Sequence, residues 1–389
     1  MHDPLLAYRE RFPILEKKLY LASHTLGPVP QATRDALLEF YDAWNEEGII
    51  AWDGPWWRSV TEFSELLEDI LHAPRGTVVP MQNVTRAFAA IFSCFEFENT
   101  ERSRVVTTGL EFTTTRPFLT QQRRLGAQVE FVRSDDGINI PTERICEAID
   151  ERTRLVVVSH TFFRSAALAD LKTIAKAAHD KGAYLVGDGY QTAGCVPVRV
   201  QDLDVDFFVG GSHKWLCGGP GAGYMYVKKS LIPTLEPRFR GWFGLKDPFA
   251  FAQGDAGLEL NEGVYRFLAG TPNVPACYSA REGLKIIREI GDEAIREKSL
   301  RMTRWCMEQA DARGITVRTP RADDQRSGMV CLDFDGAREA CDALCAQDVL
   351  CDYRPDCGVR MSPHFFTTMD ELGTFFERLD RIRSSAVTA

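Results

Sequence analysis

The sequence predicts an α/β protein built on a mainly parallel sheet, and three observations support this prediction. Between residues 77 and 230, short β-branched runs alternate with segments of helical periodicity. One such segment, 170–182, has apolar residues at helical spacing between two β-branched runs and ends at Gly182. Strand, helix and strand in succession form βαβ units, whose parallel sheet is covered by helices on both faces. In such sheets, ligands bind at the carboxyl ends of the strands.

The elements of the amino-terminal and central parts are predicted in chain order. A turn-rich start with Gly27-Pro28 leads into an amphipathic stretch that begins near Gln31. A tryptophan-rich loop at 44–57 precedes a second helical pattern at 57–72. Six strands are then expected, at residues 105–108, 129–132, 155–159, 183–188, 206–211 and 223–227.

The pattern changes after residue 280, where one or two long helices are expected. They lead to a strand at 327–335, a helix at 337–348 and a last helix from about Met369. We therefore predict two domains. The large domain covers 46–265, and the smaller α+β domain combines 1–45 with 266–389.

Composition and charge exclude several classes of protein. Hydrophobic residues make up 44% and charged residues 26% of the 389, as in a soluble globular protein. The net charge is −9 and basic residues do not cluster, so no nucleic-acid partner is expected. No apolar run approaches the roughly 18–20 residues of a membrane span, and the start lacks the apolar core of a signal peptide. We therefore expect no membrane partner.

The cysteines indicate a compartment but no metal site. Eleven cysteines are scattered through the chain without a CxxC pair, and no His, Cys and Asp cluster has ligand spacing. The sequence thus predicts no metal. Together with the missing signal peptide, this pattern favours reduced thiols in a cytoplasmic protein.

The residues with the clearest chemistry lie between 187 and 227. Asp188 ends one predicted strand, and Lys214 follows another within Ser212-His213-Lys214, with glycines nearby. A desolvated lysine suits Schiff-base chemistry, and a neighbouring carboxylate can pair with the pyridinium nitrogen of pyridoxal phosphate (PLP). Taken singly, Asp188 could be a turn or cap residue and Lys214 a solvated surface residue. The glycine-rich segment after Lys214 lacks the ending of a P-loop, which argues against nucleotide binding.

The sequence resembles the fold-type-I PLP enzymes of the class V aminotransferase superfamily, and within it the kynureninases. The resemblance covers nearly the whole chain. It rests on landmarks that occur in order: YLASHTLGPVP, W…GIIAWDGPWW, EFTTT (111–115), GDGYQTAGCVPV, SHKWLCGGPG, GWFG (241–244), RFLAGTP (266–272) and CDYRP…VRMSPHFF.

The resemblance implies roles for the residues around the cofactor ring. Lys214 would form the Schiff base and then shuttle protons at the substrate α-carbon. Asp188 would pair with the pyridine nitrogen, and Phe112 would stack on the ring, although a phenylalanine there could also be core packing. Gln191 stands where kynureninases have histidine and where cysteine desulfurases have the glutamine that faces the phenolic oxygen.

The resemblance also implies a phosphate site and a substrate clamp. Phosphate would be bound by the Asn83-Val84-Thr85 turn, by His213 and Trp242, and by Thr271 of the partner subunit. Arg360 would bind the substrate carboxylate through a bidentate pair. A site built across two subunits implies a homodimer, with the 44–57 loop at the interface and in the pocket wall. Trp242 could instead fill a domain interface, and Arg360 could form a surface salt bridge.

Five positions depart from the kynureninase pattern, namely His24, Thr115, Phe163, His213 and Leu245. They leave the cofactor-binding residues in place but alter groups that would recognise an aryl ketone, which points to a changed substrate. We therefore expect a PLP-dependent enzyme acting on an amino acid, with kynureninase-like hydrolytic Cβ–Cγ cleavage as the first candidate.

Other activities remain open alternatives. A cysteine desulfurase or C–S lyase needs a mobile thiolate, and Cys357 lies near the position where desulfurases have theirs. A class V aminotransferase or epimerase would use the same cofactor site. A catalytically silent binding protein is the alternative from another class, and the joint presence of Lys214, Asp188 and Arg360 argues against it.

Overall fold

Seven strands form one large sheet in a computed structural model that describes residues 3–251 and 257–387. The strand order is β2-β8-β7-β6-β5-β3-β4. The strands are β2 (Val78–Met81), β3 (Arg104–Thr108), β4 (Gln128–Val132), β5 (Thr153–Ser159), β6 (Tyr184–Asp188), β7 (Phe207–Gly211) and β8 (Gly223–Val227).

The sheet is mainly parallel, as predicted. From β4 through β3, β5 and β6 to β7, every neighbouring pair runs parallel, whereas β8 is antiparallel to both β7 and β2. All six predicted strands are confirmed within a residue or two of their ends. The sequence analysis missed β2, a short edge strand that contains Pro80.

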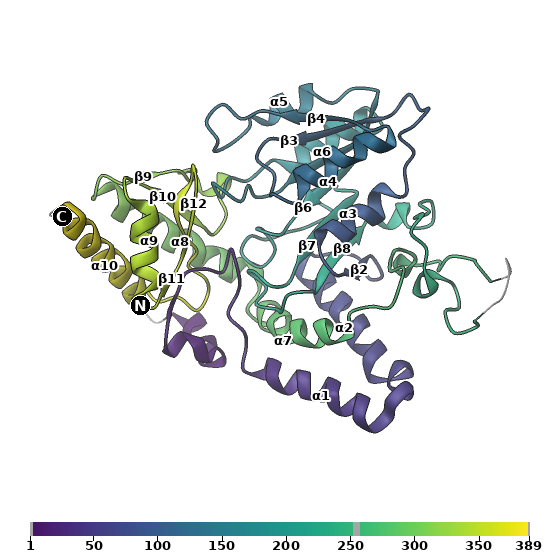
Figure 1. Cartoon of the computed structure of the whole chain (residues 1–389), viewed down its shortest axis with the longest axis horizontal. Helices are drawn as coiled ribbons and strands as arrows, with labels where there is room; N and C mark the ends of the chain where they lie inside the picture. Colours follow the sequence, from purple (N-terminus) through teal and green to yellow (C-terminus); the bar gives the residue numbers. More distant parts are fainter. Residues whose placement is uncertain (1–2, 252–256, 388–389) are drawn as a thin grey trace.

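Both faces of the large sheet are buried. Along β5, Leu155 and Val157 belong to one apolar cluster, while Val156 and Val158 belong to another on the opposite face. Alternate residues of a strand point to opposite faces, so both layers need a helical cover. Figure 1 shows helices packed around this sheet. They are α2 (Pro55–Ile70), α3 (Val84–Phe92), α4 (Thr115–Gln122), α5 (Thr142–Glu147), α6 (Leu171–Asp180) and α7 (Val274–Ile290). Helix α1 (Ala32–Glu47) lies outside this layer and packs against α2 and α7.

The crossover helix α6 has the boundaries that its sequence predicted. The side chain of Asp170 accepts a hydrogen bond from the Thr173 N–H at 3.0 Å and so caps the helix. At the other end, Gly182 has a φ of +67°, which ends the helix and turns the chain toward β6.

A smaller antiparallel sheet lies beside the large one, with the order β12-β13-β10-β9 (Figure 1). Its strands are β9 (Thr316–Val317), β10 (Val330–Asp333), β12 (Asp352–Arg354) and β13 (Gly358–Met361). The helices α8 (Asp292–Asp311), α9 (Ala337–Cys345) and α10 (Met369–Val387) pack against it around a separate apolar cluster. The predicted pair of long helices is therefore α7 and α8, separated by Gly291.

The amino-terminal segment packs on the carboxy-terminal part of the chain. Strand β1 (Leu19–Tyr20) runs parallel to β11 (Val349–Leu350), and Arg9 forms an ion pair with Glu371 at 2.7 Å. Helix α7, by contrast, buries its apolar side in the same cluster as α2. The division into 46–265 and the remainder stays a prediction. Among the described residues, no helix is long and apolar enough to cross a membrane.

Candidate active site

A cavity of about 320 Å³ lies at the carboxyl ends of β5, β6 and β7. Strand β5 ends at Ser159 and β6 at Asp188, two residues paired in register, and Lys214 follows β7. Predicted cofactor residues from distant parts of the chain line this cavity: Asn83, Val84, Thr85, Phe112, Asp188, Gln191, His213 and Lys214. The lining also includes Thr114, Ser159, Thr161, Phe163 and Tyr190, which the sequence analysis did not select.

Lys214 presents a largely buried amine to the cavity. Its Nζ lies 5.2 Å from the ring centroid of Phe112 and 5.2 Å from that of Tyr190. Burial lowers the pKa of Lys214 to about 8, although the nearby Asp188 carboxylate opposes this shift. A substantial fraction of the amine is therefore neutral near physiological pH, as a nucleophile requires.

The loop that carries Lys214 is held in place by the amino-terminal turn. The Gly27 N–H donates to the carbonyl oxygen of His213 at 2.8 Å. A Cβ at position 27 would lie 2.1 Å from the carbonyl oxygen of Lys214, so only glycine fits there. The turn at residues 20–30 thus belongs to the site although it lies almost 190 residues before the lysine.

Asp188 supplies the carboxylate at the base of the cavity. One of its oxygens accepts a hydrogen bond from the Tyr190 N–H at 2.9 Å. Burial raises the pKa of Asp188 to about 6, while that hydrogen bond and the Lys214 charge both oppose the shift. A buried carboxylate with spare acceptor capacity suits a cationic N–H partner.

Gln191 is oriented by two hydrogen bonds on the far side of the cavity wall. Its Oε1 accepts from the Trp215 indole N–H at 3.0 Å, and its Nε2 donates to the His24 carbonyl oxygen at 2.8 Å. This fixes which end of the amide carries N–H groups. The second N–H of Nε2 remains available as a donor to a ligand oxygen.

The amino terminus of α3 faces the same cavity. The Asn83 side chain caps the helix by accepting from the Arg86 N–H at 3.1 Å. The leading N–H groups of a helix have no partner inside the helix and favour an anion, and Val84 and Thr85 occupy these positions. His213 lines the same cavity, and burial lowers its pKa to about 4, so this imidazole is neutral at physiological pH.

A buried carboxyl group that the sequence analysis did not select, Glu111, supports the cavity floor. It accepts hydrogen bonds from the Ser159 N–H at 3.0 Å, the Ser159 hydroxyl at 2.5 Å and the Thr108 hydroxyl at 2.7 Å. Burial raises the pKa of Glu111 to about 7. The sequence feature that could have identified Glu111 was its position directly before Phe112 in the EFTTT motif.

Arg360 lies in the core rather than on the surface. Its Nε and Nη2 donate to the two carboxylate oxygens of Asp352 at 2.7 and 2.6 Å, and its Nη1 donates to the Phe163 carbonyl oxygen at 2.6 Å. The side chain is 3% exposed. Asp352, which the sequence analysis also missed, further accepts from His24 Nε2 and from the Thr25 hydroxyl, each at 2.9 Å.

Trp242 and Thr271 do not line the cavity of their own chain. They lie together, and the Trp242 indole N–H donates to the Thr271 hydroxyl at 3.3 Å. The sequence predicted Trp242 as a phosphate ligand of its own subunit and Thr271 as one from the partner subunit. Because Trp242 does not line the cavity of its own chain, both residues would have to reach the phosphate of a second subunit, and this stays a prediction.

Comparison with known proteins decides the family. The model of the aminotransferase class-V family matches residues 19–349, which contain every candidate residue except Arg360. The chain belongs to the class V aminotransferase family. It is therefore a PLP-dependent enzyme, as expected, and the cavity fits PLP because it offers an amine, a carboxylate, an exposed aromatic ring and a helix amino terminus.

Relatives within the class V family carry several names. A kynureninase from Bacillus anthracis is 29% identical, with 95% of this chain and 90% of that protein aligned. The uncharacterized aminotransferase YcbU from Bacillus subtilis is 27% identical, with 94% of each chain aligned. Among solved structures, the apo cysteine desulfurase from Thermococcus onnurineus NA1 superimposes with a TM-score of 0.85 at 22% identity, covering 98% of each chain. This last likeness concerns the fold alone.

Proposed function

We propose that this class V enzyme hydrolyses the Cβ–Cγ bond of kynurenine or a related amino acid. The observation that carries the proposal is the convergence of Lys214, Asp188 and Phe112 on one cavity in a chain that aligns over nearly its full length with kynureninases. The products would be alanine and an aromatic acid.

The residues around the cavity have separate tasks in this mechanism. When bound, PLP withdraws electrons from the substrate α-carbon. Asp188 would pair with the pyridine nitrogen of the cofactor, and Phe112 would contact its ring. The Lys214 amine, with a pKa near 8, accepts and returns the proton of the α-carbon. Val84, Thr85 and His213 would bind the phosphate group through N–H donors.

Arg360 would bind the substrate carboxylate with the donors that Asp352 and Phe163 leave free. A guanidinium has five N–H donors, and three are used in the contacts above. The two that remain lie on the Nη1 and Nη2 atoms, which form one edge of the fork. That edge matches a carboxylate in a bidentate pair.

Of the five departures from the kynureninase pattern, Phe163 and His213 line the cavity. Phe163 is buried and contacts Phe112 edge to face, with ring centroids 5.2 Å apart. His24 has a structural task, because its ring bonds to Asp352 and to the Ser362 hydroxyl. An apolar wall of two phenylalanines favours an aryl side chain but offers it no hydroxyl donor.

Two further expectations complete the proposal. The enzyme works as a homodimer whose partner supplies Trp242 and Thr271 to the phosphate, and large apolar side chains exposed on α1 support this arrangement. The enzyme is cytoplasmic, since all eleven cysteines are free thiols.

A C–S lyase or cysteine desulfurase activity is the second candidate, favoured by the shared fold. The Cys357 thiol is fully buried and donates to the Arg164 carbonyl oxygen at 2.7 Å. Burial and the neighbouring Cys331 thiol raise the pKa of Cys357, so it is poorly suited to act as a mobile thiolate.

The deciding experiment incubates the PLP-loaded enzyme with L-kynurenine, 3-hydroxykynurenine and L-cysteine in parallel, with and without an added keto acid. Anthranilate fluorescence together with alanine release would support the proposal. Sulfide release from cysteine without anthranilate would replace it by the second candidate. Transfer of the amino group to the keto acid, with neither anthranilate nor sulfide formed, would indicate an aminotransferase.

A further inference from the structure

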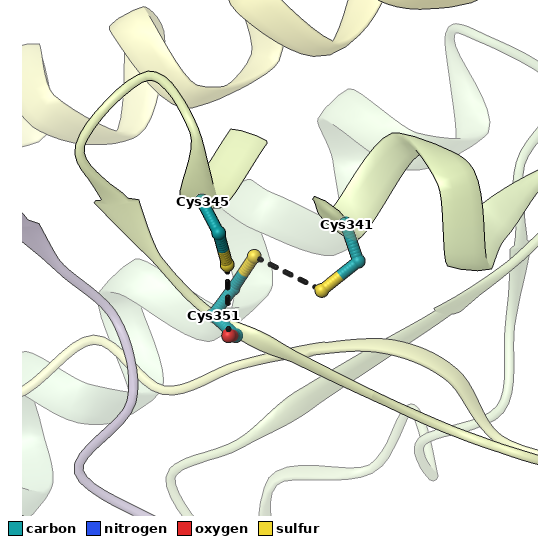
Figure 2. A group of neighbouring side chains, drawn as sticks. All are labelled: Cys341, Cys345 and Cys351. Atoms are coloured by element: carbon teal, nitrogen blue, oxygen red, sulfur yellow. Dashed lines mark hydrogen bonds between the residues drawn. The ribbon is translucent and has the colours of Figure 1, made fainter. Parts of the chain in front are cut away.

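Three cysteine thiols meet beside helix α9 (Figure 2). None of them lines the cofactor cavity. They belong to Cys341, Cys345 and Cys351, and their Sγ atoms all lie within 4.8 Å of one another. The Cys341 and Cys351 sulfur atoms are 3.8 Å apart. The sequence predicted no metal, since it contains no CxxC pair and these three residues do not have the spacing of a known ligand motif.

The backbone places the three sulfur atoms together. Cys341 and Cys345 are four residues apart on α9 and therefore share one face of that helix. Cys351 directly follows β11, which is held in place by its pairing with β1. Both supports are regular secondary structure, so the thiols are preorganised rather than brought together by a flexible loop.

The distances match those of a thiolate metal site. With metal–sulfur bonds of about 2.3 Å, sulfur atoms around a zinc-type ion lie about 3.8–4.0 Å apart. One pair already has this spacing, and the others need to move by less than about 1 Å. Thiolates are the soft ligands that d10 ions prefer.

Access also favours a metal site. Cys341 and Cys351 are buried, whereas Cys345 is exposed, so an ion can enter from the Cys345 side. Binding would release the thiol protons as the metal–sulfur bonds form.

We propose that Cys341, Cys345 and Cys351 bind one thiophilic d10 cation of the zinc class through three thiolates, with a fourth position open on the solvent side. This site is independent of the proposed reaction. Cys351 immediately precedes Asp352 at the start of β12. The ion would therefore also anchor β12, whose Asp352 forms the ion pair with Arg360.

The test titrates Cd²⁺ into the reduced PLP-loaded enzyme and follows the thiolate-to-cadmium absorption in the ultraviolet. We expect one Cd²⁺ per chain, and Zn²⁺ added in its place should raise Tm by a few degrees. Cys345→Ser should weaken Cd²⁺ binding by about 100-fold or more, because it removes one of three ligands. It should leave the melting temperature without metal unchanged, since this side chain is exposed.

Two further variants make the result specific. Cys341→Ala removes a second ligand at a helical position that tolerates alanine, and should also abolish tight binding. Cys146→Ser, at a partly buried thiol of α5, is the matched control and should bind Cd²⁺ like the unmodified enzyme. The proposal is wrong if reduced enzyme shows no thiolate absorption, or if Cys345→Ser retains full affinity. A Cys341–Cys351 disulfide in a chain that binds no Cd²⁺ when reduced would also overturn it.

Discussion

Arg360 and Asp352 face each other across the β12–β13 hairpin and form a buried bidentate ion pair, with N–O distances of 2.7 and 2.6 Å. The pair connects the amino-terminal turn with the cavity. Asp352 is hydrogen-bonded to His24 of that turn, and Arg360 donates to the carbonyl oxygen of Phe163, which lines the cavity. Asp352 thus orients the arginine that we expect to bind the substrate carboxylate. Its own pKa is held well below the usual range, because the hydrogen bonds and charges of His24 and Arg360 outweigh burial.

Asp352→Asn should destabilise the fold, because it leaves the Arg360 charge buried without a counter-charge. Breaking such a pair costs about 3–5 kcal/mol, so the free energy of unfolding in urea should fall by about 3 kcal/mol. Asp356→Asn is the control, because the Asp356 side chain is 83% exposed and its ion pair with Arg164 is long, at 3.8 Å. It should change stability by less than about 0.5 kcal/mol. Equal effects of both variants would contradict the structural account of Asp352.

Lys214→Ala should remove the covalent attachment of PLP. Borohydride reduction should yield a stable PLP adduct with the wild-type enzyme but not with this variant. The kcat should fall by about 10³-fold or more, because the proton-transfer group is missing. Lys246→Ala, at an exposed lysine, should retain both the adduct and the rate. Mass spectrometry after reduction identifies the modified peptide, and an adduct on another lysine would refute the assignment.

Glu111 should make stability depend on pH in a defined direction. Burial raises its pKa to about 7 in the folded chain from an ordinary value of 4.5, so the folded form holds the proton more tightly between these values. The contribution of Glu111 is therefore fully present below pH 4.5 and is lost as pH rises toward 7, at up to about 1.4 kcal/mol per pH unit.

Glu111→Gln tests this dependence, because glutamine cannot ionise. The unfolding free energy of the wild-type protein relative to Glu111→Gln should fall as pH rises from 4.5 to 7, and this difference should be flat above about pH 8. Urea denaturation at a series of pH values gives this difference, in which titrating groups that do not interact with Glu111 cancel. A difference that stays constant across this whole range would mean that Glu111 ionises freely in the folded protein.

The sequence predicted most of the large sheet because these strands are continuous β-branched runs. It did not predict β2, which is a strand only because it pairs with β8. Val78–Met81 is short and contains Pro80, which an edge strand tolerates because its outer side needs no N–H donor. Asp188 and Lys214 were predicted from their places at strand ends, and the other predicted lining residues from the resemblance to class V enzymes. Asp352 was missed because its role depends on the hairpin register that places it opposite Arg360.

The three-thiol cluster was missed for a similar physical reason. Cys341 and Cys345 are one helical turn apart, and only the packing of β11 brings Cys351 to them. Local spacing carries no information about such a contact. The same holds for Gln191, whose amide is oriented by a carbonyl oxygen that lies 167 residues earlier in the chain.

The exposed apolar side of α1 leads to a prediction about assembly. Tyr41 is 58% and Trp44 60% exposed, and Ile49 in the following 3₁₀ turn is 84% exposed. Large apolar side chains rarely cluster on a free surface, and a second copy of the chain would cover them. The combined variant Trp44→Glu and Ile49→Glu should therefore shift the enzyme from dimer to monomer in analytical ultracentrifugation.

Loss of the dimer should also weaken PLP binding, because Trp242 and Thr271 would no longer reach the partner's phosphate. Removing charge-assisted and neutral hydrogen bonds of this kind costs about 1–3 kcal/mol each, so PLP affinity should fall by about 10-fold or more. Leu125→Glu is the matched control, because Leu125 is 57% exposed and lies away from α1 on the η4 turn at Arg123–Leu125. It should leave both the dimer and the cofactor affinity unchanged. A monomeric variant with full PLP affinity would show that each chain completes its own phosphate site.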